Sequence, residues 1–197
     1  MQPDGVAMQG VPLACPLDVR AMGDDGVGAI YADASGTYGW GAWTAVGSTV
    51  YACCGEWSTA EIELDIATLE LYASSVGLVT LAPAASACEV YSFTDNTVAL
   101  AAMRSLSPRA EQMQLLTAAR VQWMRAQGVR EVAERVTTTA NLWADLLSRR
   151  GGVAIFEQQV AALGLELQWC EPPAAWATAQ TALAAAEAAA TAAATAA

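Results

Sequence analysis

Four carboxylates lie at positions where the apolar residues around them predict burial. They are Asp33, Glu70, Asp95 and Asp145, and each is flanked by apolar residues. An unpaired buried charge costs roughly several kcal/mol, so acids on the apolar side of an element are usually paired, hydrogen-bonded or bound to metal. Together the four acids predict one shared cation site.

Each acid taken singly also has an ordinary structural explanation. Asp33 is a residue type that starts turns, and Asp95 is a residue type that caps helices. Glu70 lies between two leucines in a helical pattern, although a solvated helix face explains it equally well. Asp145 alone says little. The joint pattern of four acids is what favours a common site.

Hydrophobic periodicity predicts the elements that must position these acids. Short aromatic or β-branched runs separated by turn residues predict three antiparallel strands, at 28–34, 39–46 and 49–54. Beyond them we expect a helix at 59–81, a strand at 88–94, a helix from 97, a helix at 108–127, a strand at 129–136 and a helix at 141–149. This order predicts an α/β fold, a mixed sheet covered by helices.

The predicted organisation has four parts. Residues 1–25 form a lead-in segment without sustained periodicity, and residues 26–151 form the main domain. Residues 152–173 form a C-terminal extension with a helix and a short strand. Residues 174–197 form a low-complexity tail rich in Ala and Thr, expected to be helical in part.

Charge and composition exclude several classes of enzyme. The 197 residues include 20 acids, nine arginines, no lysine and no histidine, for a formal net charge of −11. Catalysis by a histidine base or a histidine-bound zinc is therefore excluded. The acid excess also argues against a chain that grips nucleic acid by bulk charge. Residues 26–150 nevertheless hold 12 acids and 8 arginines, so a polyanion bridged by cations remains compatible with this segment.

Cysteine usage and the first residues bear on localisation. The five cysteines include no Cys-x-x-Cys pair and are expected to be reduced thiols. Residues 1–25 lack a basic region followed by an apolar core, so a secretory signal is not expected. The apolar stretches fall short of a spanning helix. We expect an intracellular protein, cytoplasmic or nuclear, with no membrane partner.

Four motifs then occur in a recognisable order. They read YADASGTYGWGAW at 31–43, LDIATLELYA at 64–73, FTDNTVALAAM at 93–103 and NLWADLLSRRG at 141–151. They resemble the type 1 ribonuclease H family, and most nearly the ribonuclease H domain of retroelement reverse transcriptases. The resemblance covers residues 28–151. It implies a ribonuclease H-like mixed five-stranded sheet, three antiparallel strands and then two parallel ones, flanked by helices.

The resemblance also implies a function. Asp33, Glu70, Asp95 and Asp145 would be the catalytic carboxylates and the ligands of two Mg²⁺ or Mn²⁺ ions about 3.5–4 Å apart. One ion would activate the attacking water and the other would stabilise the leaving 3′ oxygen. The implied substrate is the RNA strand of an RNA/DNA hybrid, recognised by its shape and its 2′-hydroxyls. A reverse-transcriptase domain of a parent polyprotein is the implied partner.

Four further residues are candidates for substrate contacts: Ser35, Asn96, Arg135 and Asn141. Both asparagines stand where a helix is expected to begin, and capping is the favoured alternative for them. Arg135 stands near the place where many members of the family carry a histidine that assists proton transfer or product release.

Two other functions remain open at this point. The first is a catalytically weak or inactive ribonuclease H-like domain with a structural or docking role. The missing histidine and the absence of a basic handle favour this alternative, whereas retention of all four carboxylates speaks against it. The second is a 3′-to-5′ exonuclease with a related carboxylate set. Such enzymes usually carry Asp-x-Glu on the first strand, whereas this chain reads Asp33-Ala34-Ser35.

Overall fold

The computed structural model describes residues 27–196, so the lead-in predicted at residues 1–25 lies outside the described part. The strands are β1 (Val27–Ala34), β2 (Gly39–Val46), β3 (Thr49–Glu56), β4 (Glu89–Thr94), β5 (Arg130–Arg135) and β6 (Glu166–Trp169). The helices are α1 (Ile66–Ala84), α2 (Thr97–Ser105), α3 (Glu111–Gln127), α4 (Leu142–Leu147), α5 (Gly152–Ala162), the 3₁₀ helix η2 (Ala174–Trp176) and α6 (Ala179–Ala196).

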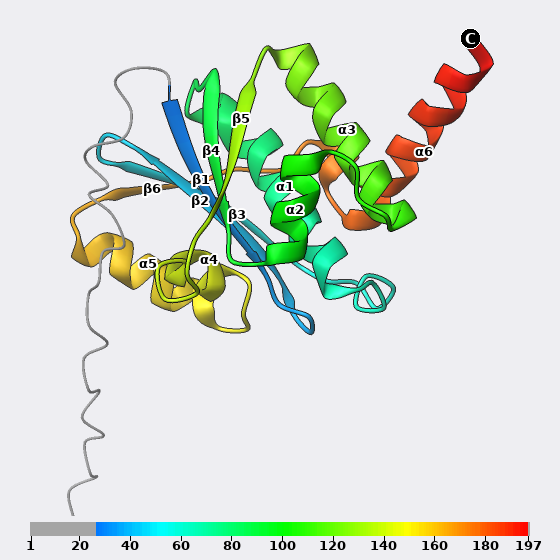
Figure 1. Ribbon diagram of the computed structural model, residues 1–197. Helices are drawn as coiled ribbons and strands as arrows, with labels where there is room; N and C mark the ends of the chain where they lie inside the picture. The colour runs from blue at the N-terminus through cyan, green and yellow to red at the C-terminus, as the bar shows by residue number, and fades with distance from the viewer. Residues whose placement is uncertain (1–26, 197) are drawn as a thin grey trace, which may run out of the picture.

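The strands form one mixed sheet with the order β5-β4-β1-β2-β3-β6. β1, β2 and β3 are antiparallel neighbours, while β4 pairs parallel with β1 and β5 pairs parallel with β4. Helices cover both faces of the sheet (Figure 1). The predicted α/β architecture, three antiparallel strands followed by two parallel ones, is confirmed.

The predicted number of five strands is wrong, because β6 adds a sixth. β6 pairs parallel with the outer edge of β3, from Thr49 opposite Glu166 to Ala52 opposite Trp169. The short strand itself was expected within the C-terminal extension, but its sheet partner was not. A strand of four residues that is mostly exposed carries little pattern to identify its neighbour.

Helix α1 begins at Ile66, seven residues later than predicted, because Asp65 caps its first turn. The Asp65 side chain accepts a hydrogen bond from the Thr68 backbone N–H at 3.0 Å. By length and composition α1 is apolar enough to cross a membrane. Its side chains from Ala67 to Ala82 are nevertheless buried within the fold, which is typical of a core helix.

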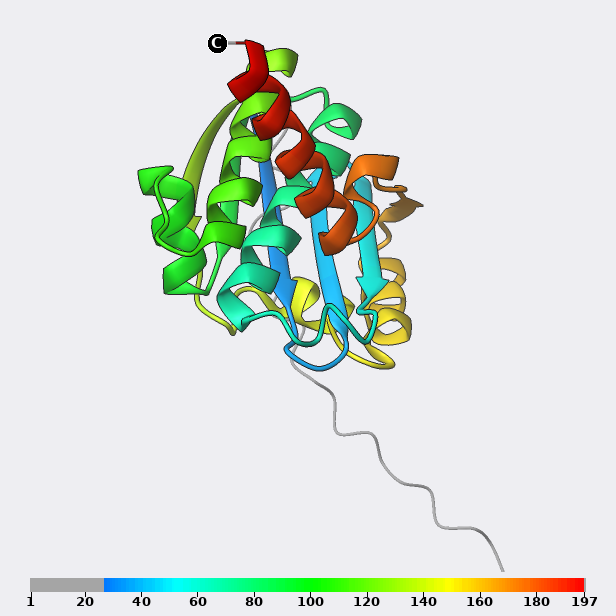
Figure 2. The same ribbon diagram turned by 90° about the vertical axis from the view of Figure 1, so that its right-hand side faces the viewer.

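Two hydrophobic cores lie on opposite faces of the sheet. α1, α2, α3 and α6 pack on one face, and in Figure 2 α1, α3 and α6 are seen side by side. α4 and α5 pack on the other face, where Tyr31 stacks between Trp43 and Phe93. The sheet is therefore a central layer between two layers of helices.

An ion pair stabilises the packing of α3 on the sheet. The guanidinium of Arg120 is fully buried and pairs with the carboxylate of Glu131 on β5. It also donates to the hydroxyl of Ser75 on α1 at 3.0 Å. A buried arginine needs such partners, because an unpaired buried charge strongly destabilises a fold. Arg120 is therefore a structural residue of the helical layer.

The C-terminal region is tied to the domain by two hydrogen bonds from buried side chains. The Tyr72 hydroxyl donates to the carbonyl oxygen of Trp176 at 2.6 Å. The Glu61 carboxylate accepts from the backbone N–H of Ala179, the first residue of α6, also at 2.6 Å. The predicted Ala/Thr tail is thus helical through α6, whose far end projects from the body of the molecule (Figure 1).

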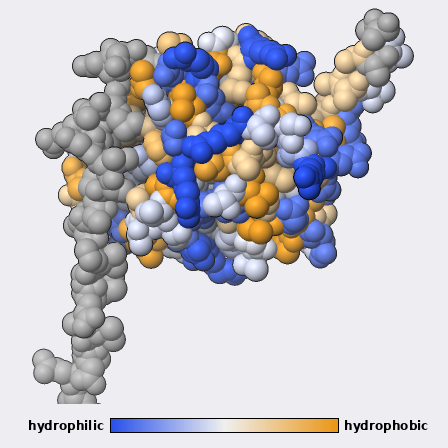
Figure 3. Space-filling model, viewed as in Figure 1, coloured by the Kyte–Doolittle hydropathy of each residue, from blue (hydrophilic) through white to orange (hydrophobic). Residues whose placement is uncertain are grey.

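Charged side chains protect the β5 edge of the sheet. Arg104 pairs with Glu134 at 2.8 Å, and Arg130 pairs with Glu89. Figure 3 shows a band of hydrophilic side chains across the face on which β5 lies. Charges on an edge strand discourage pairing with a strand of another chain.

Candidate metal centre

Three of the four predicted carboxylates meet. Asp33 lies near the end of β1, Glu70 lies on α1, and Asp95 directly follows β4. One carboxylate oxygen of each lies within 4.8 Å of the others. β1 and β4 are parallel neighbours, so their carboxyl ends reach the same edge of the sheet, and α1 packs across them. The fold therefore brings together acids separated by up to 62 positions in the sequence.

Burial and mutual repulsion disfavour negative charge in this cluster. Asp33 and Glu70 are 6% and 5% exposed. Burial, followed by the negative charges of Asp95 and Asp145, raises the pKa of Asp33 from 3.8 to about 6. Burial, followed by the charges of Asp33 and Asp95, raises the pKa of Glu70 from 4.5 to about 9. A bound cation would relieve both effects by compensating the charge.

Asp145 lies nearby but outside the group of three. Its carboxylate accepts a hydrogen bond from Arg149, one turn later, and the two form an ion pair at 2.5 Å. Its charge still contributes to the raised pKa values of Asp33 and Glu70, so it belongs to the same electrostatic site.

A glycine allows α4 to approach the sheet at this point. Gly41 on β2 is the register partner of Asp33. A Cβ at Gly41 would lie 2.1 Å from the Cβ of Leu147 and 2.8 Å from its carbonyl carbon. The Gly-Trp-Gly-Ala stretch thus lets α4 pack against β2, which brings Asp145 toward the carboxyl end of β1.

Ser148 and Thr138 donate hydrogen bonds to two of the carboxylates, and neither residue was predicted from the sequence. The Ser148 hydroxyl, which is fully buried, donates to Asp33 at 2.6 Å. The Thr138 hydroxyl donates to Asp95 at 2.6 Å. Ser148 lies three residues after Asp145, on the same face of the helix, and this spacing is the sequence signal that could have identified it.

The turn role considered for Asp33 and the capping role considered for Asp95 do not occur in the structure. Asp33 lies within β1, where it pairs with Gly41 of β2, so it does not start the hairpin turn. In that turn the Ser35 hydroxyl accepts a hydrogen bond from the Tyr38 N–H at 2.9 Å. The residue that caps α2 is Asn96, which accepts from the N–H groups of Val98 and Ala99. Asp33 and Asp95 therefore have no turn or capping role that accounts for them.

The other substrate candidates lie in different environments. The capping alternative is confirmed for Asn96 but is wrong for Asn141, which makes no capping hydrogen bond. Asn141 is buried instead, and its amide donates to the carbonyl oxygen of Ala32 on β1 at 2.9 Å. This bond ties the start of α4 to the strand that carries Asp33. Arg135 is exposed at the end of β5, opposite Thr94.

The residues of the cluster fit a divalent cation of the Mg²⁺ or Mn²⁺ type. All three carboxylates offer hard oxygen ligands, which these ions prefer. The Glu70 Oε2 atom is buried and has no hydrogen-bond partner among the described residues. A buried acceptor without a partner is costly, and coordination of a cation would satisfy it. Asp33, Glu70 and Asp95 are therefore the residues that would hold the ion.

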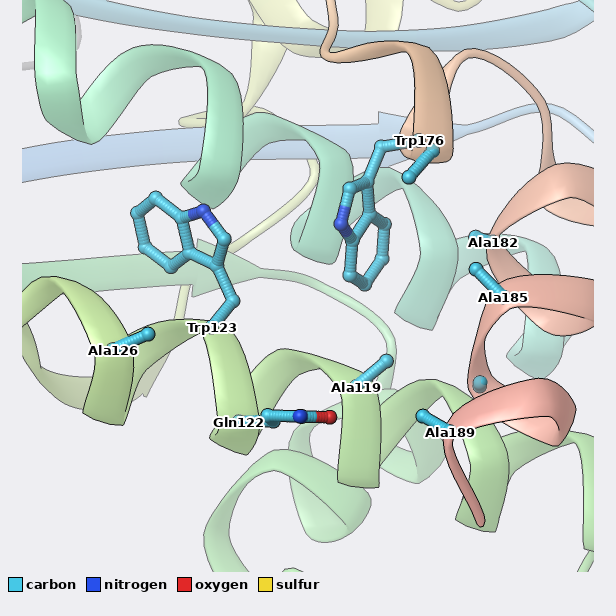
Figure 4. Close-up of a pocket in the computed structure, with 10 residues that line it drawn as sticks. Ala119, Gln122, Trp123, Ala126, Trp176, Ala182, Ala185 and Ala189 are labelled. Atoms are coloured by element: carbon cyan, nitrogen blue, oxygen red, sulfur yellow. The ribbon is translucent and has the colours of Figure 1, made fainter. Parts of the chain in front are cut away.

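A separate pocket of about 210 Å³ lies between α3 and α6, away from the carboxylates. Figure 4 shows Trp123 and Trp176 in its wall, with alanines such as Ala119 and Ala189 around them. Its ten lining residues, all within the described part of the chain, include no acid or base. This pocket offers no group for hydrolysis.

Comparisons with known proteins give a structural likeness but no match in sequence. The chain matches no protein-family model and no curated protein sequence. Among solved structures it is similar to the N-terminal RNase H domain of a Mycobacterium tuberculosis protein, solved as a fusion with maltose-binding protein. The two chains are 22% identical with a TM-score of 0.47, over 70% of this chain and 98% of the other.

Proposed function

We propose that this chain is a metal-dependent endonuclease that hydrolyses the RNA strand of RNA/DNA hybrids. The observation that carries the proposal is the meeting of Asp33, Glu70 and Asp95 within 4.8 Å at the carboxyl ends of β1 and β4. Divalent cations held by such carboxylates supply an activated water and stabilise the leaving oxygen of a phosphodiester. The four sequence motifs support the choice of hybrid as substrate.

The residues of the chain have distinct roles in this proposal. Asp33, Glu70 and Asp95 would hold the divalent cation, and Asp145 would be the fourth carboxylate of the site. Ser148 orients Asp33 through its hydrogen bond. Ser35, Asn96 and Arg135 remain the candidates for contacts with substrate, whereas the buried Asn141 joins α4 to β1.

The cellular context is a further part of the proposal. The wording of the four motifs favours an origin of this domain in a retroelement polyprotein. A reverse-transcriptase domain of that polyprotein would be the partner that strengthens substrate binding. An intracellular location, cytoplasmic or nuclear, agrees with this context.

Cleavage of a labelled RNA/DNA hybrid in Mg²⁺ or Mn²⁺ tests the proposal. Asp33→Asn and Asp95→Asn should lower the rate by about 1000-fold or more, since several kcal/mol of transition-state stabilisation are lost. Glu63→Gln, at an exposed glutamate just before α1, is the control and should cleave like the wild type. Circular dichroism would verify that each variant is folded.

Two outcomes would contradict the proposal. Equal cleavage by the wild type and the aspartate variants would assign the activity to a contaminant. A folded wild type that is inert in both metals would favour the docking role, and the pairing of Asp145 with Arg149 is the feature that fits such a role.

A further inference from the structure

A second, basic hollow lies beside the carboxylates. It has a volume of about 340 Å³ and is lined by Ser35, Thr37, Tyr38, Arg149 and Arg150. The first three residues belong to the turn between β1 and β2, and the two arginines follow α4. Two guanidinium groups and three hydroxyl-bearing turn residues thus share one concave surface.

Arg150 is held in place in this hollow without being neutralised. Its guanidinium carbon lies 5.4 Å from the centroid of the Tyr38 ring, a cation–π contact. The Tyr38 hydroxyl in turn donates to Glu56 at 2.6 Å, which fixes the ring. Within residues 27–196, Arg150 forms no ion pair. Its charge is therefore available to an external anion.

Arg149 connects the hollow to the candidate metal centre. Its guanidinium pairs with Asp145 and also interacts electrostatically with Asp33 and Asp95. More than half of the Arg149 side chain remains exposed, at 59%. The hydroxyl of Thr37, which also lines the hollow, makes no hydrogen bond with any described residue and is an unused donor.

We propose that this hollow binds a backbone phosphate of the nucleic-acid substrate, adjacent to the phosphate at the carboxylates. Guanidinium groups bind phosphate through paired, charge-assisted hydrogen bonds, which makes arginine well suited to this role. Arg150 and Arg149 are the cationic ligands, and Thr37 is a further donor. The inference rests on the proposed function and adds a contact that holds the polyanion next to an otherwise negative site.

Binding of a fluorescent RNA/DNA hybrid in EDTA, followed by anisotropy at several salt concentrations, tests this site without cleavage. Arg150→Gln should weaken binding by about 3- to 10-fold at low salt and reduce the slope of log K against log[salt] by about 1. Arg150→Lys retains the charge and should recover most of the slope. Arg125→Gln removes a charge from α3 that is also exposed and should leave the slope unchanged.

Neutral methylphosphonate linkages, placed one at a time along the hybrid, locate the contact. One linkage should weaken wild-type binding while leaving binding by Arg150→Gln unchanged. The inference is overturned if Arg150→Gln and the wild type bind the hybrid with the same affinity and slope. It is also overturned if the variant loses affinity only for inorganic phosphate, since the hollow would then take a free anion.

These outcomes are independent of cleavage. Hybrid binding that depends on Arg150 in a protein that never cleaves would refute the nuclease activity while leaving the phosphate site in place. Normal cleavage by a wild type whose binding is insensitive to Arg150 would refute the phosphate site alone.

Discussion

The hydroxyl of Ser148 donates a 2.6 Å hydrogen bond to the carboxylate of Asp33, which lies 115 positions earlier in the chain. This bond joins the end of α4 to the end of β1, on the side where Glu70 and Asp95 also arrive. A carboxylate held in one orientation is a better metal ligand than a freely rotating one.

Ser148→Ala should therefore lower metal affinity while leaving the carboxylates in place. Loss of a hydrogen bond to a metal ligand typically costs about 10- to 100-fold in affinity or activity. Calorimetric titration with Mn²⁺ should show a larger Kd, and hybrid cleavage should show a lower kcat with little change in KM. Ser107→Ala, at an exposed serine before α3, is the matched control. An unchanged Kd for Mn²⁺ would remove Ser148 from the site.

Replacement of Glu70 should stabilise the metal-free protein at neutral and higher pH. The folded protein raises the pKa of Glu70 from 4.5 to about 9 and that of Asp33 from 3.8 to about 6. The folded state thus binds protons more tightly than the unfolded state, and its stability falls as pH rises through this range. The loss from Glu70 is up to about 3 kcal/mol at pH 7.

Thermal unfolding in EDTA between pH 4.5 and 9 measures this effect. The wild type should lose Tm as pH rises, whereas Glu70→Gln should be flatter and more stable at pH 8. Mn²⁺ should restore the wild type but not the variant. Glu63→Gln should follow the wild type, since Glu63 is exposed outside the cluster. A Glu70→Gln protein less stable than the wild type at pH 8 would argue against an uncompensated charge.

Gly41→Ala should disrupt the approach of α4 to β2. The new Cβ would stand 2.1 Å from the Cβ of Leu147, with backbone atoms of Leu147 close behind, so no flexible side chain can yield. Overpacking of this kind costs about 1–3 kcal/mol or more in the free energy of unfolding. Urea denaturation measures the loss.

Gly36→Ala is the matched control for that variant. Its Cβ would meet only the Cδ1 of Ile66 at 3.8 Å, an ordinary contact. Equal stability of the two alanine variants would mean that α4 adjusts freely on the sheet.

Arg149→Gln should change metal binding and hybrid binding in opposite directions. The guanidinium neutralises Asp145 in the free protein, so its removal leaves more negative charge beside the cation ligands. Mn²⁺ affinity should rise by about 2- to 5-fold, the size expected for a partly exposed ion pair. Hybrid binding in EDTA should weaken, because a phosphate ligand is lost. A fall in both affinities would contradict the assignment of Asp145 to the metal centre.

The sequence predicted those parts of the site that depend on local pattern. Short apolar runs bounded by turn residues located β1 and β4, and the acids were expected to share a site because each is flanked by apolar residues and would otherwise be buried without a partner. The helical repeat around Glu70 identified α1, although its start was misplaced because the turn before Asp65 carries apolar residues with helical spacing. These features can be predicted because they depend only on residues that are close together in the sequence.

Other features depend on partners that no local pattern specifies. Asp145 was grouped with the other acids, but how near it comes to them is set by the packing of α4 on β2, whereas its ion pair with Arg149 is a local i,i+4 contact. Asn141 has the residue type of a cap, but burial against β1 directs its amide to Ala32 instead. The pairing of β6 with β3 likewise follows from where α5 returns the chain, which depends on the whole fold.

The hydrogen bond that Tyr72 donates to Trp176 of η2 and the one that Glu61 accepts from the start of α6 determine how far the chain can be shortened. A fragment that stopped at the end of the fourth sequence motif, at Gly151, would leave the buried Glu61 carboxylate and Tyr72 hydroxyl without these partners and would uncover one edge of β3. Expression trials should therefore keep at least the first turns of α6, and they can trim from the projecting end.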